Sequence, residues 1–195
     1  MAAAPAAQAG VIFTDNFNAE SGSNALNFNG FDNWTVSAGT VDYIRSGVQY
    51  GINCVGGIGG CIDLDGSTNN AGVLSSTTIY NLTAGLTYMF SLDLSGNQVR
   101  REGNTVTFGF ADSSNSNLFY ASDAITLFQN DPFKTYTVSF TPSGNVTARL
   151  VIGNGGGDNV GLILDNAQLE VPEPGTLALL GLGLAALGLR RRRAA

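Results

Sequence analysis

The sequence predicts an all-β fold, an antiparallel β-sandwich of the jelly-roll kind, from two observations. Apolar residues recur at every second position in several segments, which places them on one face of a strand. Clusters of glycine, asparagine, serine and proline separate these segments, as turns separate short strands. Glycine accounts for 26 of the 195 residues and charged residues for only 12% of the chain, a composition typical of a turn-rich β-protein.

Five segments show the alternation most clearly, and none of them has helical periodicity. The expected strands cover 86–94, 106–110, 136–140, 146–152 and 161–169. Turn-forming residues such as Ser95, Gly96 and Asn97 lie between them. We assign residues 10–170 to one sandwich domain, because about 160 residues are enough for a single domain with its own core.

The C-terminus has three parts: Val-Pro-Glu-Pro-Gly at 171–175, an apolar run at 176–189, and four arginines at 190–193. The prolines stop a helix from extending into the first part and keep it extended. As a helix, the apolar run would be about 21 Å long, against roughly 30 Å for the hydrocarbon core of a bilayer. Basic residues after an apolar helix stay in the cytoplasm, so the preceding chain is expected outside. A buried core helix is the alternative, and the lack of a polar stripe disfavours it.

This tail resembles the PEP-CTERM sorting signal of Gram-negative bacteria. The sorting motif is Val171, Pro172, Glu173, Pro174 and Gly175, and the cytoplasmic stop is Arg190, Arg191, Arg192 and Arg193. The resemblance implies that a membrane-inserting helix, 176–189, lodges transiently in the inner membrane. It also implies that exosortase, a membrane-embedded cysteine transpeptidase-like enzyme, cuts near the motif and releases the body to the cell surface or extracellular matrix. A tail that is never cut and simply anchors the protein is the alternative.

Residues 1–9 are rich in alanine, and Ala7-Gln8-Ala9 before Gly10 fits the small-residue pattern of a signal-peptide cleavage site. The charged and apolar regions of a signal peptide are missing from this segment. We therefore expect either the remnant of a signal peptide or a disordered end.

The two cysteines, Cys54 and Cys61, lie close together in a glycine-rich segment. In an exported protein, such an even and close pair predicts a disulfide. A loop this small is stabilised by at most about 2–3 kcal/mol. A metal site is disfavoured because no third or fourth soft ligand is present.

Composition and charge exclude several function classes. Without the four C-terminal arginines, five basic residues stand against fifteen acidic ones, a formal charge of −10, so the body cannot neutralise nucleic-acid phosphates. The chain has no histidine, which excludes Ser-His-Asp and Cys-His catalysis. We therefore expect no enzyme. The alternative is a secreted carboxylate-dependent glycosidase or lyase in which Asp63 and Asp65, at alternate positions of one strand, share a face.

A second resemblance covers the body. Its residues include Asp-Asn-Phe at 15–17 and segments that begin at Trp34, Cys61, Leu82 and Leu164. In this order they resemble the galactose-binding-like jelly rolls of carbohydrate-binding modules and of bacterial surface proteins with choice-of-anchor sorting tails. The resemblance implies a sandwich of eight or nine strands. Fold analogy alone gives no ligand.

The same resemblance implies a structural calcium ion, which in such modules ties the first strand region to the last. By position it implicates Asp15, Asn18, Glu20 and Asp165. Oxygen-only ligands and an extracellular destination suit calcium. Asn18 stands where the family usually has an acid.

A sugar-binding site needs an aromatic platform with polar groups at its edge. Tyr43 and Tyr50 flank a loop and are the expected platforms, whereas the single tryptophan, Trp34, is expected in the core. The sequence thus predicts an exported cell-surface or matrix protein that associates with exopolysaccharide. A structural envelope protein without a sugar ligand stays open.

Overall fold

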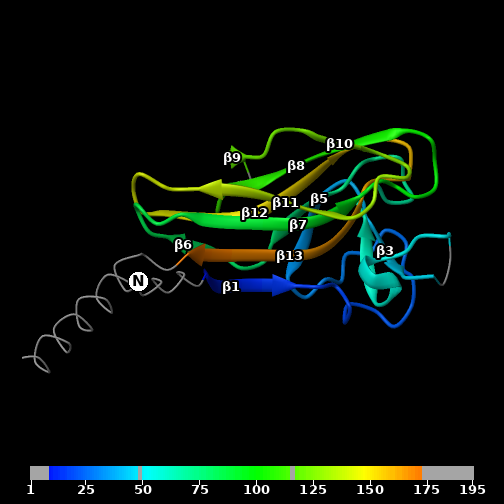
Figure 1. Cartoon of the computed structure of the whole chain (residues 1–195), viewed down its shortest axis with the longest axis horizontal. Coiled ribbons are helices and arrows are strands. Elements are labelled where there is room, and N and C mark those ends of the chain that lie inside the picture. The colour runs from blue at the N-terminus through cyan, green and yellow to red at the C-terminus, as the bar shows by residue number, and fades with distance from the viewer. Residues whose placement is uncertain (1–8, 48–49, 115–116, 173–195) are drawn as a thin grey trace, which may run out of the picture.

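The computed structural model describes residues 9–47, 50–114 and 117–172, and it confirms the all-β prediction. Two sheets of antiparallel strands pack face to face (Figure 1). The first sheet has the order β11-β7-β13-β4-β3, and β1 also pairs with β13. Its strands are β1 (Ala9–Asp15), β3 (Asp42–Arg45), β4 (Gly60–Asp63), β7 (Tyr88–Ser95), β11 (Lys134–Phe140) and β13 (Ile163–Pro172).

The second sheet has the order β10-β8-β12-β5-β2, with β6 on β12 and β9 on β8. Its strands are β2 (Trp34–Ala38), β5 (Val73–Ser76), β6 (Tyr80–Leu82), β8 (Gly103–Asp112), β9 (Leu118–Ala121), β10 (Ile125–Phe128) and β12 (Val146–Gly155). Among the described residues the single helical element is the 3-10 turn η1 (Val55–Gly57). The five segments predicted from alternation correspond to β7, β8, β11, β12 and β13.

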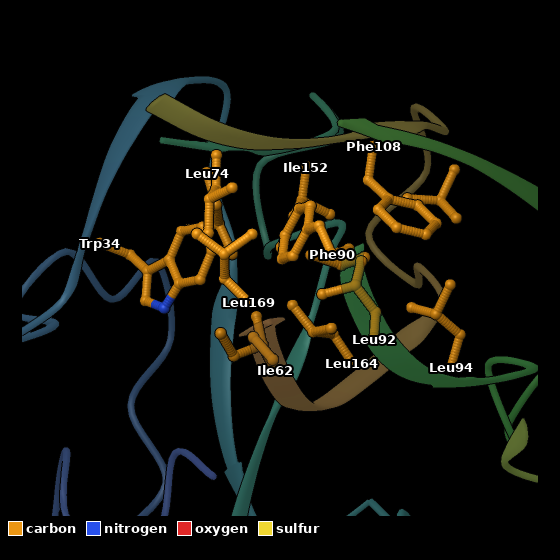
Figure 2. Close-up of a cluster of buried hydrophobic side chains, with 14 of the residues drawn as sticks. Trp34, Ile62, Leu74, Phe90, Leu92, Leu94, Phe108, Ile152, Leu164 and Leu169 are labelled. Carbon is orange, nitrogen blue, oxygen red and sulfur yellow. The ribbon is translucent and has the colours of Figure 1, made fainter. Parts of the chain in front are cut away.

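The main core lies between the sheets and contains the alternating residues of the long strands. In β7, Phe90 packs edge-on against Phe108 of β8, with ring centroids 5.3 Å apart. Trp34 is 1% exposed, and its indole N–H donates to Asp15 Oδ2 at 3.1 Å. Figure 2 shows Trp34 among the leucine and phenylalanine side chains of both sheets. The core position expected for Trp34 is confirmed.

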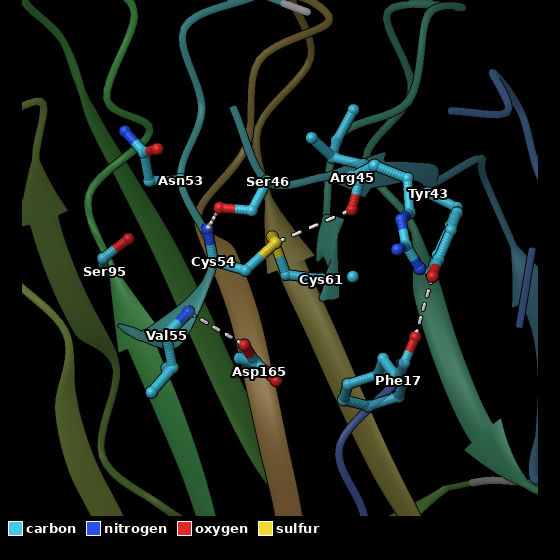
Figure 3. Close-up of a disulfide and its surroundings, with 12 residues drawn as sticks. Phe17, Tyr43, Arg45, Ser46, Asn53, Cys54, Val55, Cys61, Ser95 and Asp165 are labelled. Carbon is cyan, nitrogen blue, oxygen red and sulfur yellow. Dashed lines mark hydrogen bonds between the residues drawn. A yellow bond between two sulfur atoms is a disulfide. The ribbon is translucent and has the colours of Figure 1, made fainter. Parts of the chain in front are cut away.

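A smaller apolar cluster covers the outer face of the first sheet. It consists of Ile44, Ile52, Cys54, Cys61 and Ile163. The predicted disulfide between Cys54 and Cys61 is present, with a Cα–Cα distance of 5.4 Å. It joins the β3–β4 connection to β4 itself (Figure 3). Because the connection folds back over the sheet, the strands beneath it are buried on both faces.

Strand β13 defines the two ends of the sandwich. Its first residue, Ile163, pairs with Asp63, and its last residue, Pro172, pairs with Ala9. Ten residues of strand span about 33 Å. In Figure 1, β13 ends at the left beside the start of β1, whereas β3 lies towards the right. We call these the tail end and the far end.

The sandwich extends two residues beyond the predicted boundary at 170, because Val171 and Pro172 continue β13 opposite Gly10 and Ala9. The remaining motif residues, the predicted helix at 176–189 and the four arginines lie outside the described residues. Residues 1–8 also lie outside them. Within the described ranges, no helix is long and apolar enough to cross a membrane.

Candidate functional site

A cavity of about 300 Å³ opens at the far end, on the outer face of the first sheet. Its floor comes from β3 and β4, and its walls come from the connections that meet at this end. Residues far apart in sequence line it, among them Leu26, Asp42, Tyr50, Asp63, Val99 and Arg100. Binding cavities for small ligands start at about this volume.

Two carboxylates form the floor. Asp42 of β3 and Asp63 of β4 are direct cross-strand partners, and both are buried. Asp42 is fully engaged: its Oδ1 accepts from the Asn27 and Ser67 amides at 2.7 and 3.2 Å, and its Oδ2 accepts from the Ser67 hydroxyl at 2.8 Å. Like charges directly opposite each other are unfavourable in a sheet, so this pair is a costly feature of the fold.

Asp63 differs from Asp42 in having one oxygen free. Its Oδ1 accepts from the Asp65 and Gly161 amides at 3.0 and 2.6 Å, and its Oδ2 accepts no hydrogen bond from the described residues. Burial raises the pKa of Asp63 well above its usual range, the two amide bonds oppose that shift, and the charges of Asp42 and Asp65 add to it. The environment therefore resists a lone negative charge on Asp63.

Asp65, the expected partner of Asp63, does not line the cavity. Strand β4 ends at Asp63, and the buried Asp65 carboxylate turns towards the β12–β13 connection. There its Oδ2 accepts from the amides of Gly157 and Asp158 at 2.7 and 3.2 Å. The shared face assumed for Asp63 and Asp65 is thus wrong, because the alternation of the strand stops between them.

The rim of the cavity is apolar and largely exposed. Tyr50 is 49% exposed, and Leu26 and Val99 are exposed as well. Arg100 completes the rim, and its guanidinium forms an exposed ion pair with Asp158 at 3.2 Å. The predicted platform Tyr50 therefore lies at a cavity, and its role in binding stays a prediction.

The prediction that Tyr43 is an exposed aromatic platform is wrong. Its side chain is 0% exposed, and its hydroxyl donates to the carbonyl of Phe17 at 3.0 Å (Figure 3). Tyr43 points into the main core, whereas its neighbours Asp42 and Ile44 point outwards. Successive side chains of a strand point to opposite faces of the sheet, so Tyr43 is directed away from its two neighbours.

The residues implicated in calcium binding already have other partners. Asp15 accepts from Trp34, Asn33 and the Phe17 amide, and Asn18 Oδ1 accepts from the Gly60 amide.

Glu20 accepts from the Asp32 amide at 2.9 Å, and Asp165 accepts from the amides of Val55 and Asn166 at 3.0 and 2.8 Å. Burial is the main cause that raises the pKa of Asp165 to about 6. In the described part of the chain, no three or more acidic, cysteine or histidine side chains form a group that could hold a metal ion. Among the described residues these four therefore form no such group, and the calcium ion stays a prediction.

A second hollow, of about 490 Å³, lies at the tail end beside the β11–β12 connection. Phe119 of β9 and Phe140 of β11 line it, with ring centroids 5.5 Å apart. The neighbouring Tyr120 also contacts Phe140 and is 40% exposed. This hollow offers aromatic surface without a buried carboxylate, and it supplies a natural comparison for the far-end cavity.

Solved structures with a similar fold include both binding modules and enzymes. A cyclase from Fischerella sp. TAU is similar at a TM-score of 0.57 and 16% identity, over 84% of this chain and 98% of that chain. The CBM22-1–GH10 modules of Clostridium thermocellum xylanase 10B, complexed with xylohexaose, are similar at a TM-score of 0.50 and 15% identity, over 84% of this chain. The match covers 28% of that xylanase chain.

The CBM22-1 xylan-binding domain of Paenibacillus barcinonensis Xyn10C is similar at a TM-score of 0.46 and 11% identity, over 87% of this chain and 99% of that domain. No curated protein matches the chain in sequence. At these identities the likenesses show the fold alone, and the two with TM-scores of 0.50 and 0.57 agree with the predicted jelly roll.

The tail gives a direct match to a family model. Residues 170–193 match the PEP-CTERM protein-sorting motif, which includes the predicted motif at 171–175 and the four arginines. The motif implies export, a membrane-anchored intermediate and processing by exosortase. This chain therefore carries a PEP-CTERM sorting signal behind a jelly-roll body whose fold is similar to that of a cyclase and of part of a xylanase.

Proposed function

We propose that this protein is delivered to the cell surface or extracellular matrix by its tail and binds exopolysaccharide there without catalysis. The observation that carries the proposal is the far-end cavity, which combines an exposed tyrosine rim with a buried polar floor. A sugar ring needs this combination, because it presents C–H groups on its faces and hydroxyl groups at its edges.

The cavity supplies a partner for each part of a sugar. Tyr50, Leu26 and Val99 offer apolar surface at the rim. Asp63 and Asn159 also line the cavity, and their side chains offer hydrogen-bonding groups. A few convergent polar groups in an otherwise apolar lining are typical of small-molecule sites.

The position of the cavity also supports the proposal. The chain leaves the sandwich at Pro172, at the tail end, and the cavity lies at the opposite end of β13. While the tail holds the protein at a membrane, a site about 33 Å away along the strand direction would be open to the surrounding polymer. The xylanase structure, of which the matched part is 28%, was solved in complex with xylohexaose, which supports a sugar ligand.

A second candidate is acid catalysis in the same cavity, favoured by the raised pKa of Asp63 and by the similarity to a cyclase. A retaining glycosidase places its carboxyl groups about 5 Å apart on opposite sides of the scissile bond. Asp42 and Asp63 instead lie side by side on one floor, and Asp42 is fully hydrogen-bonded. This arrangement favours binding over glycoside hydrolysis. Turnover of a polysaccharide that disappears in Asp63→Asn would establish the enzyme instead.

Retention of the full chain on immobilised matrix polysaccharide and on xylan tests the proposal. Tyr50→Ala is expected to weaken retention by about tenfold, the effect of losing an aromatic contact worth about 1.4 kcal/mol. Tyr120→Ala is the matched control, because Tyr120 is similarly exposed at the tail end. Unchanged retention in Tyr50→Ala, or a larger loss in Tyr120→Ala, would overturn the assignment of the far-end cavity.

A further inference from the structure

We propose that the far-end cavity selects a polysaccharide with free amino groups, an unacetylated amino sugar whose ammonium binds Asp63 Oδ2. This inference rests on the proposed function and specifies its ligand class. It follows from the Asp63 carboxylate oxygen that accepts no hydrogen bond from the described residues, from the charge of the lining and from the chemistry of the walls.

The unpartnered oxygen belongs to a side chain that is only 4% exposed. Both donors near Asp63, the amides of Asp65 and Gly161, are taken by Oδ1. Asp63 lines the cavity, and no described residue donates a hydrogen bond to its Oδ2. Asp65 Oδ1 is among the described buried side-chain atoms without a partner, whereas Asp63 Oδ2 is not, so Asp63 Oδ2 keeps accessible surface. A ligand in the cavity can therefore reach this oxygen, and a cationic donor placed there gains a charge-assisted hydrogen bond.

The charge of the lining is negative. Asp42 lies directly across from Asp63, and both line the cavity. Arg100 is the one basic residue among the described lining residues, and its guanidinium is engaged by Asp158, with Glu102 also close at 3.9 Å. The floor therefore attracts a cation and repels a uronate.

The walls favour an organic cation over a metal ion. They include the apolar side chains of Ile44, Ile52 and Val160. A calcium ion requires six to eight oxygen ligands, and the described residues provide no group of three acidic side chains that could hold one. An amino sugar fits both parts of the cavity, because its C–H groups contact the walls and its ammonium carries three donors.

The charge also separates an amino sugar from its acetylated form. N-acetylation replaces the ammonium by a neutral amide that offers one N–H donor. Hydrogen bonds to charged groups are roughly twice as strong as neutral ones. The amine form is therefore expected to bind about tenfold more tightly than the acetylated form.

Calorimetric titration of the full chain with two matched oligosaccharides tests the inference. The probes are glucosamine oligomers and N-acetylglucosamine oligomers of equal length, with an oligogalacturonate as the anionic probe. The wild type is expected to prefer the glucosamine oligomer about tenfold and to bind the uronate least.

Two variants locate the preference. Asp63→Asn keeps an oxygen for the Asp65 and Gly161 amides but replaces Oδ2 by a donor, so the preference for the amine should disappear. Asp123→Asn is the matched control, because it removes one negative charge from an exposed residue outside the cavity. It should keep the preference. Melting temperatures show that both variants are folded.

A third variant keeps the test decisive if Asp63→Asn does not fold. Arg100→Ala removes the one basic side chain from the described lining and should increase the preference for the amine. A decrease would refute the inference.

The outcomes separate the inference from the proposed function. If the glucosamine and N-acetylglucosamine oligomers bind equally and binding still depends on Tyr50, the preference for free amino groups is refuted. The proposal that the far-end cavity binds polysaccharide would then still hold. Equal loss of preference in Asp63→Asn and Asp123→Asn shows general charge attraction and also refutes it. Absence of binding to every polysaccharide refutes the proposed function itself.

Discussion

The disulfide connects stability to the proposed site, and this gives the sharpest prediction. Cys54 and Cys61 are both buried and belong to the apolar cluster on the outer face of the first sheet. The same cluster contains Ile52, which also lines the cavity, and Tyr50 lies two residues before it. Removal of the bond is therefore expected to affect both folding and binding.

The magnitude follows from the size of the closed loop. The sequence separation of the cysteines is 7. For a loop of about 8 residues, the chain-entropy relation gives a stabilisation of about 2.5 kcal/mol at 25 °C. For a protein of this size, that loss lowers the melting temperature by about 5–10 °C.

Thermal unfolding by circular dichroism, with and without reductant, measures the effect. The double variant Cys54→Ala, Cys61→Ala should melt about 5–10 °C below the wild type and should not respond to reductant. Its retention on polysaccharide should fall, because the connection that carries Tyr50 loses its covalent attachment to β4.

The control is the oxidised wild type under the same conditions. An unchanged melting temperature in the double variant would refute the entropic argument. A lower melting temperature with full binding at a temperature where the variant is folded would show that the disulfide does not position Tyr50.

Three further predictions follow. Burial holds the pKa of Asp63 above its unfolded value, so the stability contributed by its protonated form is present below about pH 4 and is lost as pH rises through the folded pKa. Asp63→Asn should therefore have a higher melting temperature than the wild type in alkaline buffer but not at acidic pH. A difference in melting temperature that does not depend on pH would contradict this. Tyr43→Phe removes a buried hydrogen bond to Phe17 and should cost about 1–2 kcal/mol in chemical denaturation without changing polysaccharide retention; a selective loss of binding would restore Tyr43 as a ligand residue. Mass spectrometry of the surface form should find the chain cut near 171–175, and an intact arginine cluster at 190–193 would refute processing.

The long strands could be predicted from the sequence because at least part of each strand alternates between buried and more exposed residues. In β7, Tyr88, Phe90 and Leu92 are buried, and the residues between them are partly exposed. Strand β3 has no such signal, since Asp42, Tyr43 and Ile44 are all buried. The disulfide-linked connection covers its outer face, and this cover removes the alternation on which sequence reasoning depends.

Some features of the candidate site could likewise be predicted from the sequence, and others could not. The exposure of Tyr50 was predicted from its place beside a loop. The pairing of Cys54 with Cys61 was predicted from the expected export of the protein and from their close spacing in the sequence. The partner of Asp63 was not predicted: Asp42 is far away in sequence, and only the register of β3 on β4 makes them neighbours. A shift of one residue in that register would turn either side chain to the other face.

The sequence by itself determined the sorting signal, the fold class, the disulfide and the core position of Trp34. Each of these depends on residues that are close in the chain or on a strong local pattern. The tertiary structure decided that Tyr43 is buried, that Asp65 leaves the cavity and that Asp42 and Asp63 share its floor. These features depend on strand register and on which loop covers which face, which are set by packing between distant segments.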